Sequence, residues 1–289
     1  MSPELPRTPP SPRPGPPPRP RLIATDLDGT LLRRDGTVSP RTVAALAAAE
    51  EAGIAVVFVT GRPVRWMDAV SAHVHGHGMA ICDNGAALVD LRDGGQRLVE
   101  ARELPRPNAL AAVRALRLAA PGVSFAVERT LGVHHEPRYP PMLRDPVTEV
   151  ASVEKLLGPP PAYADEPVLK LLAFHPELDP DAFLALGREV AGEYGEFTRS
   201  SPTALLEVSG PGVSKASTLA RRCRLLGISR EEVVAFGDMP NDLEMLHWAG
   251  TAWAMGNSHP VVLAATRRHT ASNEEDGVAR VIERMLAGT

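Results

Sequence analysis

The chain has 289 residues, a formal net charge of −4 and 44 % apolar residues, enough for one large domain or two of ordinary size. Acidic and basic residues are mixed along it, so the basic stripe of a nucleic-acid-binding protein is not expected. No apolar run approaches the roughly 18 residues that a membrane span needs. Cys82 and Cys223 lie far apart in apolar segments and form neither a disulfide framework nor a CxxC metal site, which favours a reduced, cytoplasmic setting.

The first 20 residues contain ten of the 29 prolines and almost no apolar residues. Such a segment cannot bury enough surface to offset the entropy of ordering, so we expect a disordered, partly polyproline II tail at residues 1–20. The tail lacks the apolar stretch of a secretory signal. Its PxxP spacings would suit a protein partner with an SH3-like groove, and a solvated tail without a partner is the plainer alternative.

Ordered structure is expected from residue 21, where strands and helices alternate. Ser39 followed by Pro40 marks the start of a helix that ends near Gly53, and a second helix is expected from Pro63. An Asp-Gly sequence at residues 35–36 predicts a small hairpin. Apolar runs predict buried strands at residues 21–25, 54–60 and 79–86. This alternation is typical of a parallel sheet covered by helices.

From about residue 87 the pattern changes to strand pairs mixed with helices. Strand-like segments are expected at 86–105, 123–139, 164–176 and 196–210, and helices at 108–120 and 179–195. We therefore expect a separate α+β domain at residues 87–201, inserted within a sheet domain made of residues 21–86 and 202–289.

After Gly210 the alternating pattern resumes. A helix is expected at residues 212–227 with Lys215 in its first turn, followed by a capping box of Ser229 and Glu232. A strand at residues 233–238 then ends at Asp238, and further helices and strands alternate to the end of the chain.

Polar side chains follow the predicted strands at the points where those strands end. Ligands of parallel sheets bind beyond the carboxyl ends of the strands, so these side chains are expected to meet. Asp26, Thr60, Asn84 and Asp238 are at such strand ends, and the other groups expected at the same edge are Asp28, Lys215, Asn241 and Asp242. Four crowded carboxylates raise one another's pKa values, and a divalent cation would relieve the repulsion. Hard oxygen ligands favour Mg²⁺ over zinc, while the lysine, the hydroxyl and backbone amides suit a phosphoryl group.

Four motifs occur in order along the chain: DLDGT at 26–30, VVFVTGR at 56–62, SK at 214–215 and GDMPNDLEM at 237–245. In these motifs the chain resembles the phosphatases of the haloacid dehalogenase superfamily. The insertion after DNGA at 83–86 and the segment SNEEDGVARVIE at 272–283 resemble the Cof-type, or IIB, branch. The resemblance covers residues 21–289 and implies a Rossmann-like α/β core with an inserted α+β cap of the C2 class, together with Mg²⁺-dependent phosphatase activity.

The resemblance also implies roles for the charged residues. Asp26 is the expected nucleophile and forms an aspartyl-phosphate, and Asp28 is the expected general acid and then base. Asp26, Asp238 and the backbone carbonyl of Asp28 are expected to ligate Mg²⁺. Asp242 is expected to bind the metal through water or to hold the residues that ligate it. Lys215 is expected to neutralise charge on the phosphoryl group and on Asp26.

Other positions are implied in binding the phosphoryl group: Gly29, Thr60, Gly61, Lys215 and Asn241. Arg62 and Asn84 flank the site, where each either contacts the substrate or has a structural role, as an ion pair or a turn. In the cap, His134 and His135 are candidates for substrate contact. The HVHGHG sequence at 73–78 looks like a metal tract, but it offers no fourth ligand nearby and is expected to be a loop.

The leading prediction is Mg²⁺-dependent hydrolysis of a small phosphomonoester, either a sugar phosphate or a nucleotide or cofactor phosphate. A phosphosugar mutase resembling phosphomannomutase is an alternative, and a dedicated sucrose-phosphate or mannosyl-phosphoglycerate phosphatase is a narrower one. A non-catalytic phosphate-binding or scaffold protein that uses the proline-rich tail is a third. The intact set of Asp26, Asp28, Lys215 and Asp238 argues against that last alternative.

Overall fold

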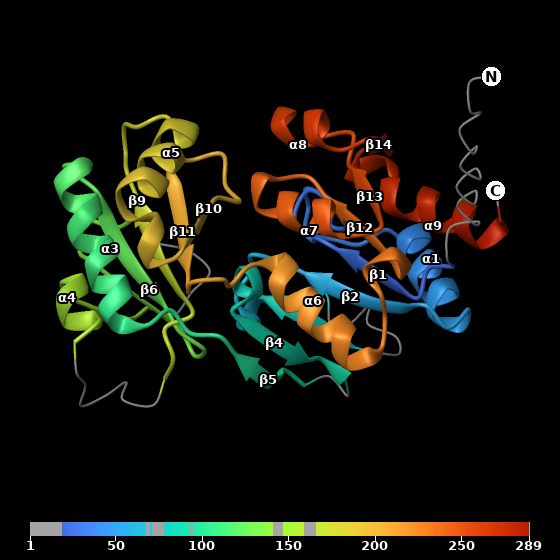
Figure 1. Cartoon of the computed structure of the whole chain (residues 1–289), viewed down its shortest axis with the longest axis horizontal. Helices are drawn as coiled ribbons and strands as arrows, with labels where there is room; N and C mark the ends of the chain where they lie inside the picture. The colour runs from blue at the N-terminus through green and yellow to red at the C-terminus, as the bar shows by residue number, and fades with distance from the viewer. Residues whose placement is uncertain are drawn as a thin grey trace, which may run out of the picture.

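The computed structural model describes residues 19–67, 70, 78–92, 95–140, 147–158 and 166–288. In this part of the chain, two sheets stand beside each other, one with eight strands and one with six (Figure 1). The tail expected at residues 1–20 lies outside the described residues except for its last two, and so does the histidine tract except for Gly78. None of the described helices combines the length and apolar character that crossing a membrane requires.

The eight-stranded sheet is mostly parallel, with the order β14-β13-β12-β1-β2-β3-β4-β5. Its parallel strands are β1 (Leu22–Thr25), β2 (Ala55–Val59), β3 (Met79–Cys82), β12 (Val233–Gly237), β13 (Thr251–Ala254) and β14 (Arg268–His269). The antiparallel hairpin of β4 (Ala87–Asp90) and β5 (Arg97–Ala101) extends it at one edge. The expected helix-covered parallel sheet is confirmed.

The central strands of this sheet carry apolar residues on both faces, and helices cover both faces. Ile23 packs in a core with α1 (Pro40–Glu51) and α9 (Gly277–Ala287), whereas its neighbours Leu22 and Ala24 pack in a second core with α6, α7 and α8. The bounds of these three helices are Lys215–Leu226, Leu243–Trp248 and Pro260–Ala265. Local signals set the ends of α1 and α6. Ser39 caps the first turn of α1, and Gly227 closes α6 in the left-handed conformation.

The six-stranded sheet has the order β10-β11-β9-β6-β7-β8. Its strands are β6 (Ser124–Glu128), β7 (Val133–His135), β8 (Val147–Val150), β9 (Lys170–Phe174), β10 (Glu196–Thr198) and β11 (Leu205–Ser209). Helices α3 (Arg106–Ala119), α4 (Val153–Leu156) and α5 (Pro180–Ala191) pack on the side away from the eight-stranded sheet (Figure 1). We call the other side, which faces the eight-stranded sheet, the open face. The register places Glu128, Lys170, Leu172, Leu205 and Glu207 on it.

Two strand assignments differ from expectation. The hairpin expected to open the inserted domain at residue 87 pairs instead with β3, with Cys82 opposite Ala87. A single tight turn, Asp83–Gly85, joins β3 to β4, so the chain folds straight back on its neighbour. Conversely, β11 lies within the range expected for the sheet domain but pairs with β9 and β10. The chain therefore passes from the eight-stranded to the six-stranded sheet after β5 and returns after β11, not at residues 87 and 202.

Two smaller elements near the site are also corrected. The turn expected at residues 35–36 forms, with Gly36 at a φ of 82°. The described residues on either side of it are not paired as strands, and the nearest pairing is an isolated bridge between Asp28 and Leu32. After Pro63 the structure has a short 3-10 turn, Val64–Trp66, and the rest of the expected helix lies largely outside the described residues.

Candidate active site

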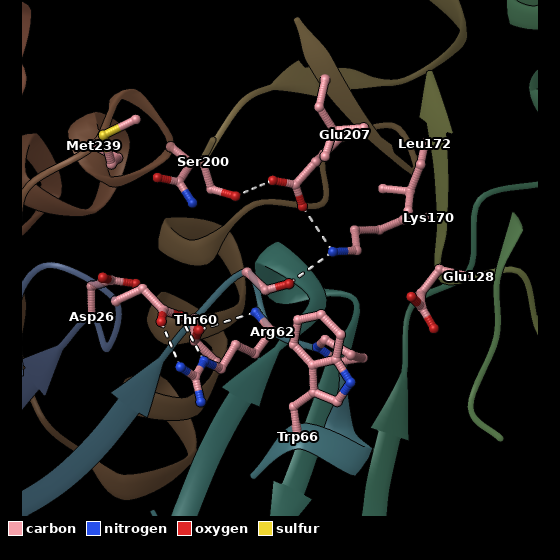
Figure 2. Close-up of a pocket in the computed structure, with 15 residues that line it drawn as sticks. Asp26, Thr60, Arg62, Trp66, Glu128, Lys170, Leu172, Ser200, Glu207 and Met239 are labelled. Atoms are coloured by element: carbon pink, nitrogen blue, oxygen red, sulfur yellow. Dashed lines mark hydrogen bonds and ion pairs between the residues drawn. The ribbon is translucent and has the colours of Figure 1, made fainter. Parts of the chain in front are cut away.

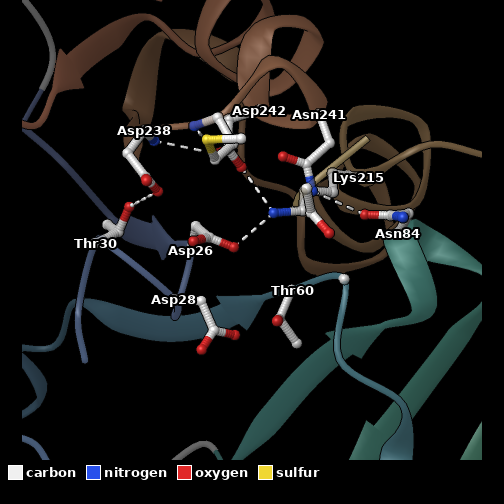
Figure 3. A network of polar contacts seen from close by, with 12 residues as sticks. Asp26, Asp28, Thr30, Thr60, Asn84, Lys215, Asp238, Asn241 and Asp242 are labelled. Atoms are coloured by element: carbon white, nitrogen blue, oxygen red, sulfur yellow. Dashed lines mark hydrogen bonds and ion pairs between the residues drawn. The ribbon is translucent and has the colours of Figure 1, made fainter. Parts of the chain in front are cut away.

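Neighbouring strands bring the first and fourth motifs together. β1 pairs with β12 in parallel, with Thr25 opposite Phe236, so the residues that follow both strands emerge at the same edge (Figure 3). The backbone N–H of Asp26 donates to the carbonyl of Phe236 over 3.1 Å. Asp26 and Asp238 therefore lie next to each other although more than 200 positions separate them in the chain.

A buried lysine joins two of the site carboxylates. Lys215 Nζ lies 2.6 Å from Asp26 Oδ1 and 2.7 Å from Asp242 Oδ1, and the lysine is 1 % exposed. It is the first residue of α6, whose N-terminus Ser214 caps through the backbone N–H of Ser217. The start of this helix thus places the ammonium group directly beside Asp26.

Asp242 is held by the turn in which it lies. Its Oδ2 atom accepts hydrogen bonds from the backbone N–H groups of Asp238 and Met239, each over 3.0 Å. Gly237 leaves room for this arrangement, since a Cβ atom there would lie 2.5 Å from Asp242 Cβ. The fourth motif is therefore one turn that fixes two of its own carboxylates relative to each other.

Three buried carboxylates form a cluster that could hold a metal ion. One oxygen each from Asp26, Asp238 and Asp242 lies within 4.8 Å of the others. Gly29, at a φ of 81°, passes so close that a Cβ atom would lie 2.3 Å from Asp238 Oδ2. Thr30 Oγ1 donates to Asp238 Oδ1 over 2.8 Å and orients that carboxylate. The side chain of Asp28 is not part of this cluster, and the expected role of its backbone carbonyl stays a prediction.

The charges in this cluster shift the pKa values of its members. Burial raises the pKa of Asp26 well above its ordinary value, although the ammonium group of Lys215 opposes the shift. Burial, reinforced by the carboxylate of Asp242, raises the pKa of Asp238 to about 7. Burial alone would lower the pKa of Lys215, but Asp242 and Asp26 together outweigh it and hold this pKa above its usual range. Lys215 pairs with only two of the three clustered carboxylates, so a second positive charge would be stabilising.

Asp28 lies at the mouth of the site and is paired with Arg62. Arg62 Nε donates to Asp28 Oδ2 over 2.6 Å, and Arg62 Nη2 donates to Asp28 Oδ1 over 2.5 Å. The Asp28 side chain is 59 % exposed. Of the two alternatives for Arg62, the structure shows the ion pair, while the residue also lines the pocket described below.

Thr60 follows β2 at the same edge of the sheet. Its hydroxyl accepts from the backbone N–H of Arg62 over 3.0 Å and is buried. Asn84 adopts the left-handed conformation with a φ of 53°, which is the turn role considered for it. Its backbone N–H donates to the carbonyl of Thr60 and its Oδ1 accepts from Asn241 Nδ2, each over 3.0 Å, so Asn84 joins the second and fourth motifs.

A pocket of about 240 Å³ connects this edge with the open face of the six-stranded sheet (Figure 2). Asp26, Thr60 and Asn241 line its inner end, and Asp28 lines it at the mouth. Residues from the other sheet, including Leu172, line its outer end. A small molecule in this pocket would touch the carboxylates at one end and the open face at the other.

The family model of the haloacid dehalogenase-like hydrolases matches residues 23–282. The chain belongs to this family. It is 30 % identical to the 5-amino-6-(5-phospho-D-ribitylamino)uracil phosphatase YitU of Bacillus subtilis, with 91 % of this chain and 97 % of that protein covered. It is 31 % identical to the pyridoxal phosphate phosphatase YbhA of Escherichia coli, with the same coverage. A solved structure described as a sugar phosphatase of subclass IIB has a TM-score of 0.74 at 22 % identity, covering 91 % of this chain and 98 % of that one.

These matches confirm the family resemblance that the four motifs indicate. The chain is a hydrolase of the haloacid dehalogenase-like family, a phosphatase that acts on phosphorylated small molecules.

The sequence did not single out the charged residues of this hydrolase's open face. Lys170 Nζ donates to the carbonyl of Gly61 and to Glu207 Oε2, each over 2.8 Å, and lies 3.5 Å from Asp83 Oδ1. Burial raises the pKa of Asp83 to about 8 against the opposing charge of Lys170. Lys170 and Glu207 each interrupt an apolar strand, in VLKLLAF and ALLEVSG, and that interruption was the available signal.

The two cap histidines that the sequence offered for substrate contact do not line the pocket. His134 is 3 % exposed, and burial together with Arg129 lowers its pKa to about 4. His135 is 8 % exposed, and its Nδ1 lies 2.7 Å from the carbonyl oxygen of Glu136. Strand alternation turns His134 toward the helix-covered side. His135, opposite Ala126, is on the open face beside Tyr139 but is not among the residues that line the pocket.

Proposed function

We propose that the chain is a Mg²⁺-dependent phosphatase that hydrolyses a small phosphomonoester through an aspartyl-phosphate on Asp26. The observation that carries this proposal is the position of Asp26 at the inner end of the pocket, 2.6 Å from Lys215 Nζ and within the cluster of three carboxylates. A nucleophilic carboxylate beside a fixed cation and a metal site is suited to phosphoryl transfer. The six-stranded sheet with α3, α4 and α5 would serve as the cap.

The residues around Asp26 fit the expected metal. Asp26 and Asp238, with Asp242 behind them, supply hard oxygen donors, and Thr30 orients one carboxylate. Mg²⁺ bound there would neutralise charge on the phosphoryl oxygens and favour the ionised form of Asp26, whose pKa is otherwise raised by burial.

In the first step, an oxygen of Asp26 attacks phosphorus, and the bond from phosphorus to the ester oxygen breaks. Asp28, carrying a proton, gives it to the departing alcohol oxygen. In the second step, water attacks the phosphoryl group, Asp28 takes up a proton of that water, and the bond to Asp26 breaks to release phosphate. Arg62 occupies both oxygens of Asp28 in this structure, so one oxygen would leave this contact to carry the proton in each transfer.

Lys215 and the phosphoryl-binding residues prepare the site in advance. Lys215 balances the negative charge that the phosphoryl group brings beside Asp26. The Thr60 hydroxyl, the Gly61 amide and the Asn241 side chain line the pocket at the same end. The Asn241 Oδ1 atom is buried without a hydrogen-bond partner among the described residues, so this amide has capacity left for a ligand.

The substrate would be a sugar phosphate or a nucleotide or cofactor phosphate, in keeping with the substrates named for the relatives. Two buried free cysteines support a reducing, cytoplasmic location.

The test is phosphate release by the purified full-length chain from a panel of sugar, nucleotide and vitamin phosphates. We expect release with Mg²⁺, loss of release with a chelator and recovery when Mg²⁺ is restored. Isomerised hexose phosphate in place of free phosphate would favour the mutase alternative. Phosphate or ester binding without any release would favour the non-catalytic alternative.

A further inference from the structure

The outer end of the pocket differs from its inner end in what it presents to a ligand. Glu128, Lys170 and Glu207 line it, yet each exposes 3 % of its surface or less. Trp66, Leu205 and Met239 also line it and are only partly buried. The surface available to the alcohol part of a substrate is therefore mainly aromatic and apolar.

The buried charged groups are already engaged with the protein. The three donor positions of the Lys170 ammonium group face the carbonyl of Gly61, Glu207 and Asp83. Glu207 accepts from Lys170 and from Asn84 Nδ2 over 2.8 Å each, and Ser200 donates to its other oxygen (Figure 2).

Glu128 is held in the same way, because both of its oxygens accept from the guanidinium of Arg65. Ser200 is exposed, but its hydroxyl hydrogen is used by Glu207.

A phosphorylated polyol would fit this end poorly. Each hydroxyl that enters it leaves water and needs a partner, and a buried hydroxyl without one costs about 1–3 kcal/mol. Taking a partner from Lys170 or Glu128 would leave another buried charge without its own. A planar ring needs few such partners and gains from contact with an aromatic side chain.

We propose that the pocket selects phosphomonoesters whose alcohol carries a planar, largely apolar ring next to Trp66, and that it disfavours phosphorylated polyols. The inference rests on the proposed phosphatase function and names the substrate class for that site. Trp66 lies on the short turn after Arg62, so the ring would stand directly beside the phosphoryl-binding end (Figure 2).

Four esters of primary alcohols test the proposal with similar leaving groups: benzyl phosphate, cyclohexylmethyl phosphate, glucose 6-phosphate and ethyl phosphate. We expect kcat/KM for benzyl phosphate to exceed that for glucose 6-phosphate by about tenfold or more, which is the effect of one unpaired hydroxyl. Equal or better use of glucose 6-phosphate would overturn the proposal. Equal use of the benzyl and cyclohexylmethyl esters would overturn its planar part.

Substitutions locate the selection on named residues. Trp66→Leu should lower the benzyl-to-ethyl ratio of kcat/KM by about threefold to tenfold, and Trp66→Phe should keep most of it. Leu205→Asn should shift the ratio toward glucose 6-phosphate and provides a second test if Trp66→Leu does not fold. Leu118→Ala, at an 87 % exposed position on α3, is the control and should leave every ratio unchanged. Unchanged ratios in both Trp66→Leu and Leu205→Asn would contradict the assignment.

A binding measurement separates this inference from the proposed function. If no ester is hydrolysed, ethyl phosphate included, the proposed function fails, and calorimetry with benzylphosphonate, ethylphosphonate and glucose 6-phosphate still decides the selectivity. Tighter binding of benzylphosphonate than of the other two would support the pocket assignment. Tighter binding of glucose 6-phosphate would overturn it.

Discussion

The two ends of the pocket use charged residues in opposite ways. At the strand ends, Lys215 pairs with two of three clustered, buried carboxylates, so negative charge is in excess among them. On the open face, Glu128 pairs with Arg65 and Glu207 pairs with Lys170. Asp83 lies 3.5 Å from Lys170, and burial raises its pKa to about 8, so it adds little negative charge at neutral pH. An excess of buried charge prepares a site for an ion, whereas matched charge holds two parts of a protein in one arrangement. The comparison separates residues that act on a ligand from residues that shape its surroundings.

The largest effect is expected at the strand ends. Asp26→Asn keeps the size of the side chain but removes the nucleophile, so kcat should fall by about four orders of magnitude or more. Phosphate release measures turnover, and circular dichroism checks the fold. Asp35→Asn, in an exposed turn, is the matched control and should retain activity. Turnover near that of the unchanged protein would rule out Asp26 as the nucleophile.

Removing one partner from the matched charges should cost stability. Lys170→Met leaves Glu207 buried without its cation, so the free energy of unfolding should fall by about 3–5 kcal/mol in urea titrations. Adding Glu207→Gln should recover part of this loss because the unpaired charge is gone. The exposed pair of Lys155 and Glu149 is the control, and Lys155→Met should cost about 1 kcal/mol or less. Equal losses for both lysine variants would show that the open-face pair does not hold the structure together.

The helix-covered side of the six-stranded sheet should respond to pH. The pKa of His134 is about 4 in the folded chain and 6.5 as its ordinary value, so the unfolded chain binds more protons between these values. The neutral His134 therefore leaves the free energy of unfolding at its full value above pH 6.5. As the pH falls toward 4, this free energy decreases by up to about 3 kcal/mol. His134→Phe should flatten the unfolding free energy over this window. If the unfolding free energy of His134→Phe falls with pH as steeply as that of the unchanged protein, other groups cause the pH dependence.

The smallest effect is expected at Thr30, which touches the carboxylate cluster from outside. Thr30→Val removes the hydroxyl that orients Asp238, so the Mg²⁺ concentration for half-maximal activity should rise by about 10- to 100-fold. Activity should return at saturating Mg²⁺, as expected for a positioning residue. Thr37→Val, at an exposed turn, is the control. An unchanged Mg²⁺ requirement would show that the Thr30 hydroxyl does not position a metal ligand.

Many element boundaries in the domain of the eight-stranded sheet could be predicted because the signals that set them are local. The start of α1 at Ser39 and Pro40 depends on one turn of backbone, and so does the end of α6 at Gly227. The placement of β4 and β11 could not be predicted in the same way. Both are ordinary apolar strands, and only pairing with β3 or with β9 and β10 decides their sheet.

The sequence by itself determined the family and the short motifs whose residues gather at the strand ends, because parallel strands bring the residues that follow them to one edge. Only the tertiary structure decided how Lys170 and Glu207 are used, since their partners Gly61, Asn84 and Asp83 come from a distant part of the chain. It also decided that the histidines at 134 and 135 lie away from the pocket while Trp66 lines it. The physical reason is that pairing between buried charges depends on distances in space, which spacing along the chain does not reveal.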